Sequence, residues 1–239
     1  MAAKRKTENR GRGRKPEGAG GTRHRPVAEG GSRRPAAGDG GLVVLGSASE
    51  RRRKILRALG VRFEAVAPRV REVSYARDPR RTAVENARRK HAWCRRRYPG
   101  RLIITADTVI DLDGRLVEKP RSVAEARAFL RRFSGRRHTV LTALVLGGDG
   151  RPPVVRVDEA RVTFKKLRAA TVERYLARVN PLDKAGAYDI DQHGDWLIAA
   201  LEGSHSNVMG LPAALVREEM RRWRERTGTW NSNRCRSGR

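Results

Sequence analysis

The 239-residue chain carries 54 Lys and Arg residues against 26 Asp and Glu residues, a formal net charge of +28, and only two Cys residues. This length suits one domain with tails, or two small lobes. Two distant cysteines exclude a disulfide framework or a cysteine metal cluster, and the five scattered His residues show no metal-ligand spacing. No apolar run is long enough to span a membrane, and we find no secretory signal. We therefore expect a cytoplasmic protein without a membrane partner.

The excess of positive charge predicts an anionic partner: a nucleotide, a nucleic acid or an acidic surface. Residues 41–216 alone carry a net +16, so the middle of the chain is basic as well as its ends. A general preference for arginine codons is the competing explanation, because Arg is spread over every segment.

The two ends differ in composition from the middle. Residues 1–40 are rich in Gly, Pro, Arg and Lys and nearly devoid of apolar residues, so they bury too little surface to offset the entropy of ordering. We expect a disordered basic tail over residues 1–40, a folded domain over 41–226 and a loose tail over 227–239. The tails would either contact nucleic acid or stay solvated, as charge runs usually do. A misassigned start codon would also explain residues 1–40.

The first predicted elements are a strand, a serine-containing turn and a helix. Residues 42–45 are apolar, Ser47-Ala48-Ser49 forms the turn, and a helix begins after the N-cap Ser49 and ends before Gly60. A helix N-terminus of this kind presents backbone N–H groups to an anion, and the three arginines and one lysine over residues 51–54 would add positive charge beside it. The glycine-rich phosphate loops of the common nucleotide-binding families do not occur in the sequence.

A second strand is expected over residues 63–67, followed by a loop that contains Glu72. A long helix then covers about residues 80–98, with Val84, Ala87, His91 and Cys94 near one face. Lys90 lies on this helix among many other cations. Neither Glu72 nor Lys90 points to a site when taken alone.

The centre of the chain predicts a β-hairpin. The run Leu102-Ile103-Ile104 is typical of a buried strand, and we place Asp107 where that strand ends. Asp113-Gly114 predicts a two-residue turn, because both residues tolerate positive φ. Counting back from the turn pairs Leu112 with Arg115, Ile110 with Val117 and Thr108 with Lys119. The hairpin thus brings a lysine beside a carboxylate at a sheet edge where ligands bind, or else forms an ordinary surface ion pair.

The second half of the chain adds helices to an antiparallel sheet. Ser122 and Glu125 form a capping box for a helix that ends at Phe133, with Ala126, Phe129, Leu130 and Phe133 facing inward. The remaining elements are expected to be strands over residues 138–146 and 154–167, a short helix over 171–178, a polar loop over 180–188, a strand over 196–201 and a last helix from Ala213.

Taken together, these segments resemble the Maf family of nucleoside triphosphate pyrophosphatases, also described as septum formation proteins. The resemblance covers residues 42–216. The matching stretches, in order, are Ser47-Ala48-Ser49-Glu50-Arg51-Arg52, Glu72, Lys90, Ala106-Asp107-Thr108, Glu118-Lys119-Pro120, residues 130–135, Pro181-Leu182-Asp183-Lys184-Ala185-Gly186-Ala187-Tyr188, Glu202-Gly203 and Asn207-Val208-Met209-Gly210-Leu211-Pro212.

The resemblance implies an α/β fold, in which a long twisted mixed sheet is flanked by helices and two lobes enclose a central cleft, as in inosine triphosphatase-like proteins. It also implies hydrolysis of a nucleoside triphosphate between the α and β phosphates by the domain over residues 41–226. A divalent metal cation (Mg, Mn or Co) and, weakly, a homodimer are implied too. An alternative function, binding of nucleic acid or a division protein through the basic tails with catalysis secondary, stays open.

The resemblance also assigns roles to the isolated residues. It implies that Asp107 is the general base or metal-linked carboxylate and that Glu72 helps to hold the metal. Lys90 and Lys119 would neutralise the phosphates. Arg52 and the turn from Ser47 to Ser49 would hold the triphosphate, with Thr108 beside them. Such a set suits phosphoryl transfer, which depends on positioning and charge neutralisation.

The sequence departs from the family pattern at two places. Glu50 replaces the usual Pro after the second serine, which suits a helix N-terminus. After Tyr188 the dTTP/UTP-type members usually have Gly-Ile-Gln, where this chain has Asp189-Ile190-Asp191 and then Gln192. An ionised carboxylate accepts hydrogen bonds but donates none, so Asp191 would alter the choice of base. Tyr188 and the preceding loop remain closer to the dTTP/UTP type.

Overall fold

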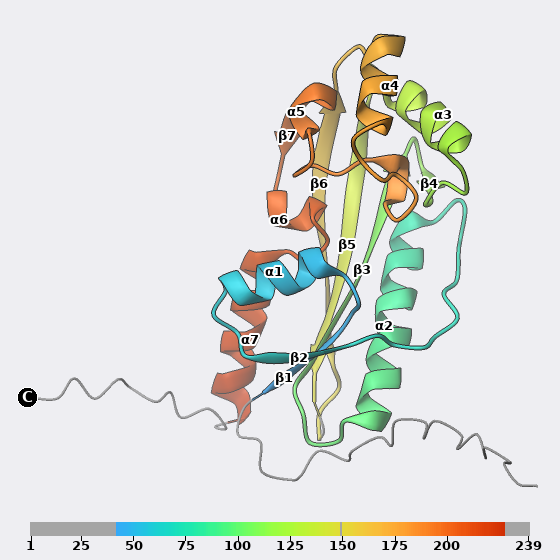
Figure 1. Cartoon of the computed structure of the whole chain (residues 1–239). Helices are drawn as coiled ribbons and strands as arrows, with labels where there is room; N and C mark the ends of the chain where they lie inside the picture. Colours follow the sequence, from blue (N-terminus) through green and yellow to red (C-terminus); the bar gives the residue numbers. More distant parts are fainter. Residues whose placement is uncertain (1–41, 149, 228–239) are drawn as a thin grey trace, which may run out of the picture. The chain divides into compact units, whose positions relative to one another are not determined.

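A computed structural model describes residues 42–148 and 150–227, all within one compact unit (Figure 1). The tail expected over residues 1–40 lies outside the described residues. So does the tail expected over 227–239, except for Thr227, which is the last residue of the final helix. Over the described part of the chain, no helix is long and apolar enough to cross a membrane.

A seven-stranded mixed sheet forms the centre of the fold (Figure 1). Its order is β2-β1-β3-β5-β6-β7, and β4 pairs with β3 along the same edge as β1, beyond the end of β1. Strand β1 runs parallel to β2 and β3, and the other pairs are antiparallel, as expected for the second half of the chain. The strands are β1 (Val43–Gly46), β2 (Phe63–Val66), β3 (Ile103–Leu112), β4 (Arg115–Val117), β5 (Arg137–Gly147), β6 (Val154–Phe164) and β7 (Ile198–Glu202).

The helices flank this sheet, which confirms the expected α/β class. They are α1 (Glu50–Ala58), α2 (Pro79–Arg97), α3 (Val123–Phe133), α4 (Ala169–Leu176), α5 (Gly194–Leu197), α6 (His205–Val208) and α7 (Ala213–Thr227), with a 3₁₀ turn η1 (Ala185–Ala187). The predicted caps are present, because the Ser49 side chain accepts from Arg52 N–H and the Ser122 side chain accepts from Glu125 N–H.

Trp196 and Leu197 were expected in a strand but close the short helix α5, and β7 begins only at Ile198. The difference has a local cause. His193 adopts a left-handed conformation that starts the helical turn, and its ring then stacks on the Trp196 indole at 4.2 Å.

Strand β3 organises the two faces of the sheet. Its residues alternate in direction, as in any strand. Ile103, Thr105, Asp107 and Val109 face α2, whereas the even-numbered residues face the other side. On that other side Ile104 and Ala106 join a core with α1 and α7, and Ile110 and Leu112 join a second core with α3 and α4. These two cores are the expected two lobes, and Thr108 lies between them.

Asp107 is not at a strand end, contrary to the expectation from sequence. Strand β3 continues to Leu112, and Asp107 pairs with Ala143 of β5. The opposite edge of β3 pairs with β1 as far as Thr105 and with β4 from Ile110. Among the described strands, none pairs with this edge over residues 106–109. The open edge, rather than a strand end, gives Asp107 its access.

The hairpin turn forms as predicted, with positive φ at Asp113 and Gly114. The pairs Ile110–Val117 and Leu112–Arg115 are confirmed. The third expected pair, Thr108 with Lys119, does not form, because β4 ends at Val117. Beyond it the Glu118 carbonyl accepts a hydrogen bond from Gly186 N–H at 3.1 Å, which draws the chain away from β3.

Candidate active site

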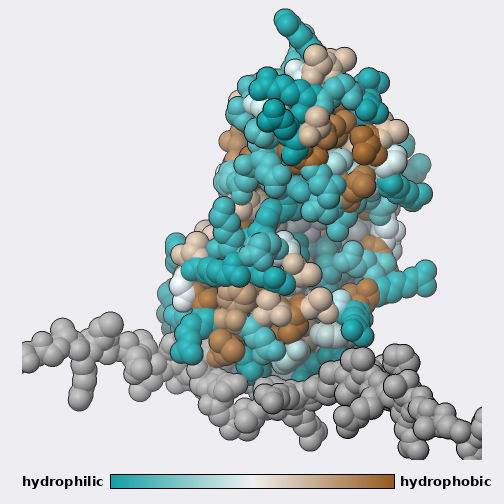
Figure 2. Space-filling view, viewed as in Figure 1, coloured by the Kyte–Doolittle hydropathy of each residue, from teal (hydrophilic) through white to brown (hydrophobic). Residues whose placement is uncertain are grey.

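A cavity of about 980 Å³ surrounds the open edge of β3. Its walls come from the β1–α1 turn, the loop after β2, α2, the segment after β4, the loop over residues 183–192 and the segment before α7. Figure 2 shows this face hollowed at mid-height, with mostly hydrophilic side chains around the hollow. No described strand pairs with this edge of β3 over residues 106–109, so the cavity reaches side chains on both faces of the strand. Asp107 and Thr108 therefore both line it.

Lys90 joins two carboxylates on the α2 side of β3. Its ammonium nitrogen lies 2.6 Å from Asp107 Oδ1 and 2.6 Å from Glu72 Oε1. Burial raises the pKa of Asp107, and the hydrogen bond and charge of Lys90 partly offset this rise. Burial also opposes ionisation of Glu72, but Lys90, Lys119 and Arg52 together outweigh it and lower the pKa of Glu72. The two carboxylates that Lys90 joins therefore differ in acidity, because the pKa of Asp107 is raised and the pKa of Glu72 is lowered.

Asn86 holds this group in place, although the sequence alone did not single it out. Its side chain accepts from Val73 N–H at 2.8 Å and donates to the Val73 carbonyl at 3.0 Å, which fixes the loop that carries Glu72. Its Nδ2 also lies 3.4 Å from Asp107 Oδ2. The available signal was a polar side chain one helical turn before Lys90, on the face of α2 that points to the sheet.

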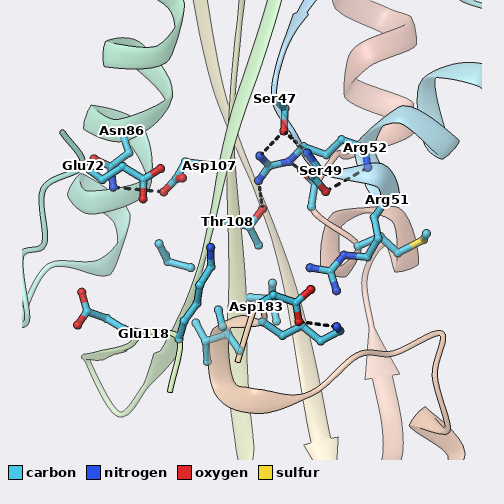
Figure 3. A pocket seen from close by; sticks show the side chains of 18 of the residues that line it. Ser47, Ser49, Arg51, Arg52, Glu72, Asn86, Asp107, Thr108, Glu118 and Asp183 are labelled. Atoms are coloured by element: carbon cyan, nitrogen blue, oxygen red, sulfur yellow. Dashed lines mark hydrogen bonds and ion pairs between the residues drawn. The ribbon is translucent and has the colours of Figure 1, made fainter. Parts of the chain in front are cut away.

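Arg52 occupies the other face of β3, where α1 begins (Figure 3). Its guanidinium donates to the Gly210 carbonyl at 2.7 Å, to Ser47 Oγ at 3.2 Å and to Thr108 Oγ1 at 3.1 Å. Ser47 Oγ also accepts from Ser49 N–H at 3.2 Å. These bonds join the serine turn, β3 and the segment before α7, and they aim a cation and a helix N-terminus into one cavity.

The cavity brings together Ser47, Ser49, Arg52, Glu72, Lys90, Asp107, Thr108 and Lys119, all of which the sequence had singled out. Lys119 reaches the cavity from the segment after β4 and not through a pair with Thr108. Asp191, expected to contact the base, is not among the lining residues. Its carboxylate instead lies 3.3 Å from His205 Nε2, while Gln192, its neighbour, lines the cavity.

The donor set can be compared with the needs of a divalent cation. Among the described residues, no group of three or more His, Cys, Asp or Glu side chains comes together. Glu72 and Asp107 form a pair around Lys90. Such a pair fits Mg²⁺, which takes one or two protein carboxylates and completes its octahedron with phosphate oxygens and water.

The family model described as Maf-like protein matches residues 42–223. The chain belongs to the Maf family. A dTTP/UTP pyrophosphatase of Myxococcus xanthus is 42% identical over 172 residues, covering 72% of this chain and 87% of that protein. A dTTP/UTP pyrophosphatase of Deinococcus radiodurans is 41% identical over 175 residues, covering 73% of this chain and 89% of that protein. Among solved structures, a HAM1 protein from Coxiella burnetii is 13% identical, with a TM-score of 0.46. The match covers 77% of this chain and 98% of that protein.

The Maf match spans both lobes and every wall of the cavity. Within it, the departure at Asp189-Ile190-Asp191 falls on one wall only. That wall carries Asp189, Ile190 and Gln192, on the side of the cavity where Arg51 and Asp183 also lie (Figure 3). Glu72 and Asp107 lie apart from Arg51 and Asp183 in the same view (Figure 3).

Proposed function

We propose that this chain hydrolyses a nucleoside triphosphate between its α and β phosphates and releases the nucleoside monophosphate and pyrophosphate. The observation that carries the proposal is the position of Lys90 between Glu72 and Asp107, across the open edge of β3 from Arg52. Carboxylates and cations thus face one cavity from two sides. Phosphoryl transfer needs this combination, because catalysis there rests on positioning and on neutralising negative charge.

Asp107 acts as the general base in this proposal. Its burial raises its pKa and so strengthens it as a proton acceptor, while Lys90 restrains the rise. The Asp107 carboxylate takes a proton from water, and the water oxygen bonds to the α phosphorus. The bond between the α phosphorus and the oxygen that bridges the α and β phosphates then breaks. Pyrophosphate leaves with the electron pair of the broken bond.

The cations of the cavity bind the triphosphate. Arg52 is already held by three hydrogen bonds, so it loses little freedom when it contacts a phosphate. Lys119 and the N-terminus of α1 add positive charge near the same oxygens. This arrangement stabilises the charge that moves onto the leaving pyrophosphate.

Glu72 and Asp107 would hold a divalent cation together with the substrate phosphates. When bound, such an ion neutralises phosphate charge and lowers the pKa of a coordinated water. The competition between Lys90 and the ion for both carboxylates predicts that the ion binds weakly without nucleotide. It should bind more tightly when phosphate oxygens complete its coordination.

The names of the relatives favour dTTP and UTP as substrates, and the test is a nucleotide panel. The purified full chain is incubated with each common ribonucleoside and deoxyribonucleoside triphosphate, with Mg²⁺, with Mn²⁺ or with a chelator. We expect pyrophosphate from dTTP and UTP in the presence of either metal and none with the chelator. Failure to release pyrophosphate from any triphosphate would overturn the proposal.

A further inference from the structure

Asp189 is a buried carboxylate at the wall of the cavity opposite the Lys90 group. It is 3% exposed, and it follows Tyr188 directly in the chain. Its Oδ2 accepts from Arg51 Nη1 at 3.0 Å and lies 3.4 Å from Gln192 Nε2. Its Oδ1 accepts from Asp191 N–H at 3.0 Å. The carboxylate thus ties the first turn of α1 to the loop after η1.

Arg51 and Gln192 both line the cavity, so the groups that Asp189 holds are accessible to a ligand. This step rests on the proposed function. If the triphosphate lies between Asp107 and Arg52, the space left for the base is bounded by the wall that carries Asp189 and Gln192. Figure 3 shows Arg51 on the side of Arg52 and Asp183, apart from Glu72 and Asp107.

The bonds to Asp189 determine what each partner still offers to a ligand. An ionised carboxylate only accepts hydrogen bonds, so the Gln192 amide must turn its NH₂ group toward Asp189. Its carbonyl oxygen then remains as an acceptor. Arg51 has five N–H donors, and the bond to Asp189 uses one of them. The wall therefore presents donors from Arg51 beside an acceptor from Gln192.

We propose that Asp189 is a positioning residue that sets the choice of base by orienting Arg51 and Gln192. A donor beside an acceptor complements a base that carries a carbonyl next to a ring N–H, as uracil and thymine do. Cytosine presents an amino group and an unprotonated ring nitrogen at the same places, so both contacts would be mismatched. The burial of Asp189 makes the arrangement rigid before any ligand enters.

UTP and CTP form a matched pair of substrates for this proposal, since they differ only at the edge in question. We expect the wild-type chain to prefer UTP in kcat/KM by at least about tenfold, the scale of a mismatched contact with a charged donor. In Asp189→Asn the preference should fall about tenfold, through a higher KM for UTP with kcat nearly unchanged. Arg51→Gln should have the same effect, and its partly exposed side chain makes it the better choice if Asp189→Asn does not fold.

Two further variants make the test specific. Asp195→Asn is the matched control, because Asp195 is exposed and does not line the cavity. It should keep the preference for UTP. Asp191→Asn tests the rival prediction that the residue aligned with the family Gln reads the base. A loss of preference in Asp191→Asn with none in Asp189→Asn or Arg51→Gln would overturn the inference.

The outcomes separate this inference from the proposed function. Equal wild-type activity toward UTP and CTP would overturn the role of Asp189 while leaving the pyrophosphatase reaction intact. Release of pyrophosphate from neither nucleotide would overturn both. A UTP preference that both Asp189→Asn and Arg51→Gln reduce, and that Asp195→Asn retains, would support the inference.

Discussion

The ammonium nitrogen of Lys90 lies 2.6 Å from Asp107 Oδ1, and the two side chains are 12% and 11% exposed. One comes from the middle of α2 and the other from the middle of β3. Burial raises the pKa of the carboxyl group, while the neighbouring cation lowers it. The balance of these effects sets the strength of Asp107 as a base and leads to the first prediction.

Replacing Lys90 by Gln should raise the pKa of Asp107 further, because the charge and hydrogen bond that oppose burial are lost. Carboxyl ¹³C shifts followed against pH in the nucleotide-free protein measure this directly. We also expect kcat/KM to fall about 100-fold, because a protonated Asp107 cannot accept a proton from water and the lost ammonium group no longer offsets the phosphate charge. Arg89→Gln is the control, because Arg89 pairs with the exposed Glu85 on the same helix. An unchanged Asp107 titration in Lys90→Gln would contradict the prediction.

Replacing Arg52 by Gln should reduce kcat/KM about 100-fold, since a hydrogen bond to a charged group contributes about 1.5–3 kcal/mol. The change removes the cation and the bonds that join Ser47, Thr108 and Gly210. The adjacent Arg53, whose guanidinium pairs with the exposed Glu50, provides the comparison as Arg53→Gln. Steady-state kinetics should show a change of less than about threefold there. Equal losses in both variants would argue against a specific role for Arg52.

Replacing Gly210 by Ala should weaken substrate binding as well as stability. Gly210 has a φ of 104°, and an added Cβ would lie 3.1 Å from Thr108 Oγ1 and 3.3 Å from Arg52 Nε. Gly60→Ala separates the two causes, because its φ is also positive at 68° but nothing lies within 4 Å of the added atom. Both variants should lose about 1–3 kcal/mol of unfolding free energy in urea titrations. Only Gly210→Ala should raise KM, and a similar KM for both variants would refute the steric explanation.

His138 should make the fold sensitive to acid. Burial lowers its pKa from 6.5 to about 4, so protonation favours the unfolded chain. Its contribution to stability is complete above pH 6.5 and is lost as the pH falls toward 4. The loss amounts to about 3 kcal/mol, at 1.36 kcal/mol for each pKa unit.

Urea titrations between pH 7 and pH 4 test this contribution of His138. The decline in unfolding free energy should be shallower in His138→Gln, whose side chain can still bond to the Tyr188 hydroxyl. If the unfolding free energy of His138→Gln falls with pH as steeply as that of the wild type, groups other than His138 cause the acid sensitivity.

Local patterns in the sequence predicted those parts of the site that depend on neighbouring residues. The N-cap Ser49, the turn at Asp113 and Gly114, and the first hairpin pairs all follow from short-range rules that the structure confirms. The serine turn reaches the cavity for this reason. Contacts over a few residues are enough to specify it, whereas the segment that carries Lys119 is also held by the bond from Gly186 N–H to the Glu118 carbonyl.

The features that depend on distant segments could not be predicted in this way. The open edge of β3 arises because β1 stops at Gly46 and β4 ends at Val117, and neither limit is visible from β3 itself. Asn86 and Asp189 have ordinary local contexts, and their importance comes from partners elsewhere in the chain. Asp191 was expected at the cavity because it aligns with the family Gln, yet the bond from its N–H to Asp189 leaves Gln192 to line the wall instead.

The most direct test of the proposed reaction is the identity of the products, read by ³¹P NMR as UTP is consumed by the full chain with Mg²⁺. We predict UMP and pyrophosphate, at a rate that falls about 10³-fold in Asp107→Asn, the scale of a lost general base. Asp113→Asn, at the exposed hairpin turn, should match the wild type. Formation of UDP and phosphate, or equal rates in Asp107→Asn and the wild type, would contradict hydrolysis between the α and β phosphates with Asp107 as the base.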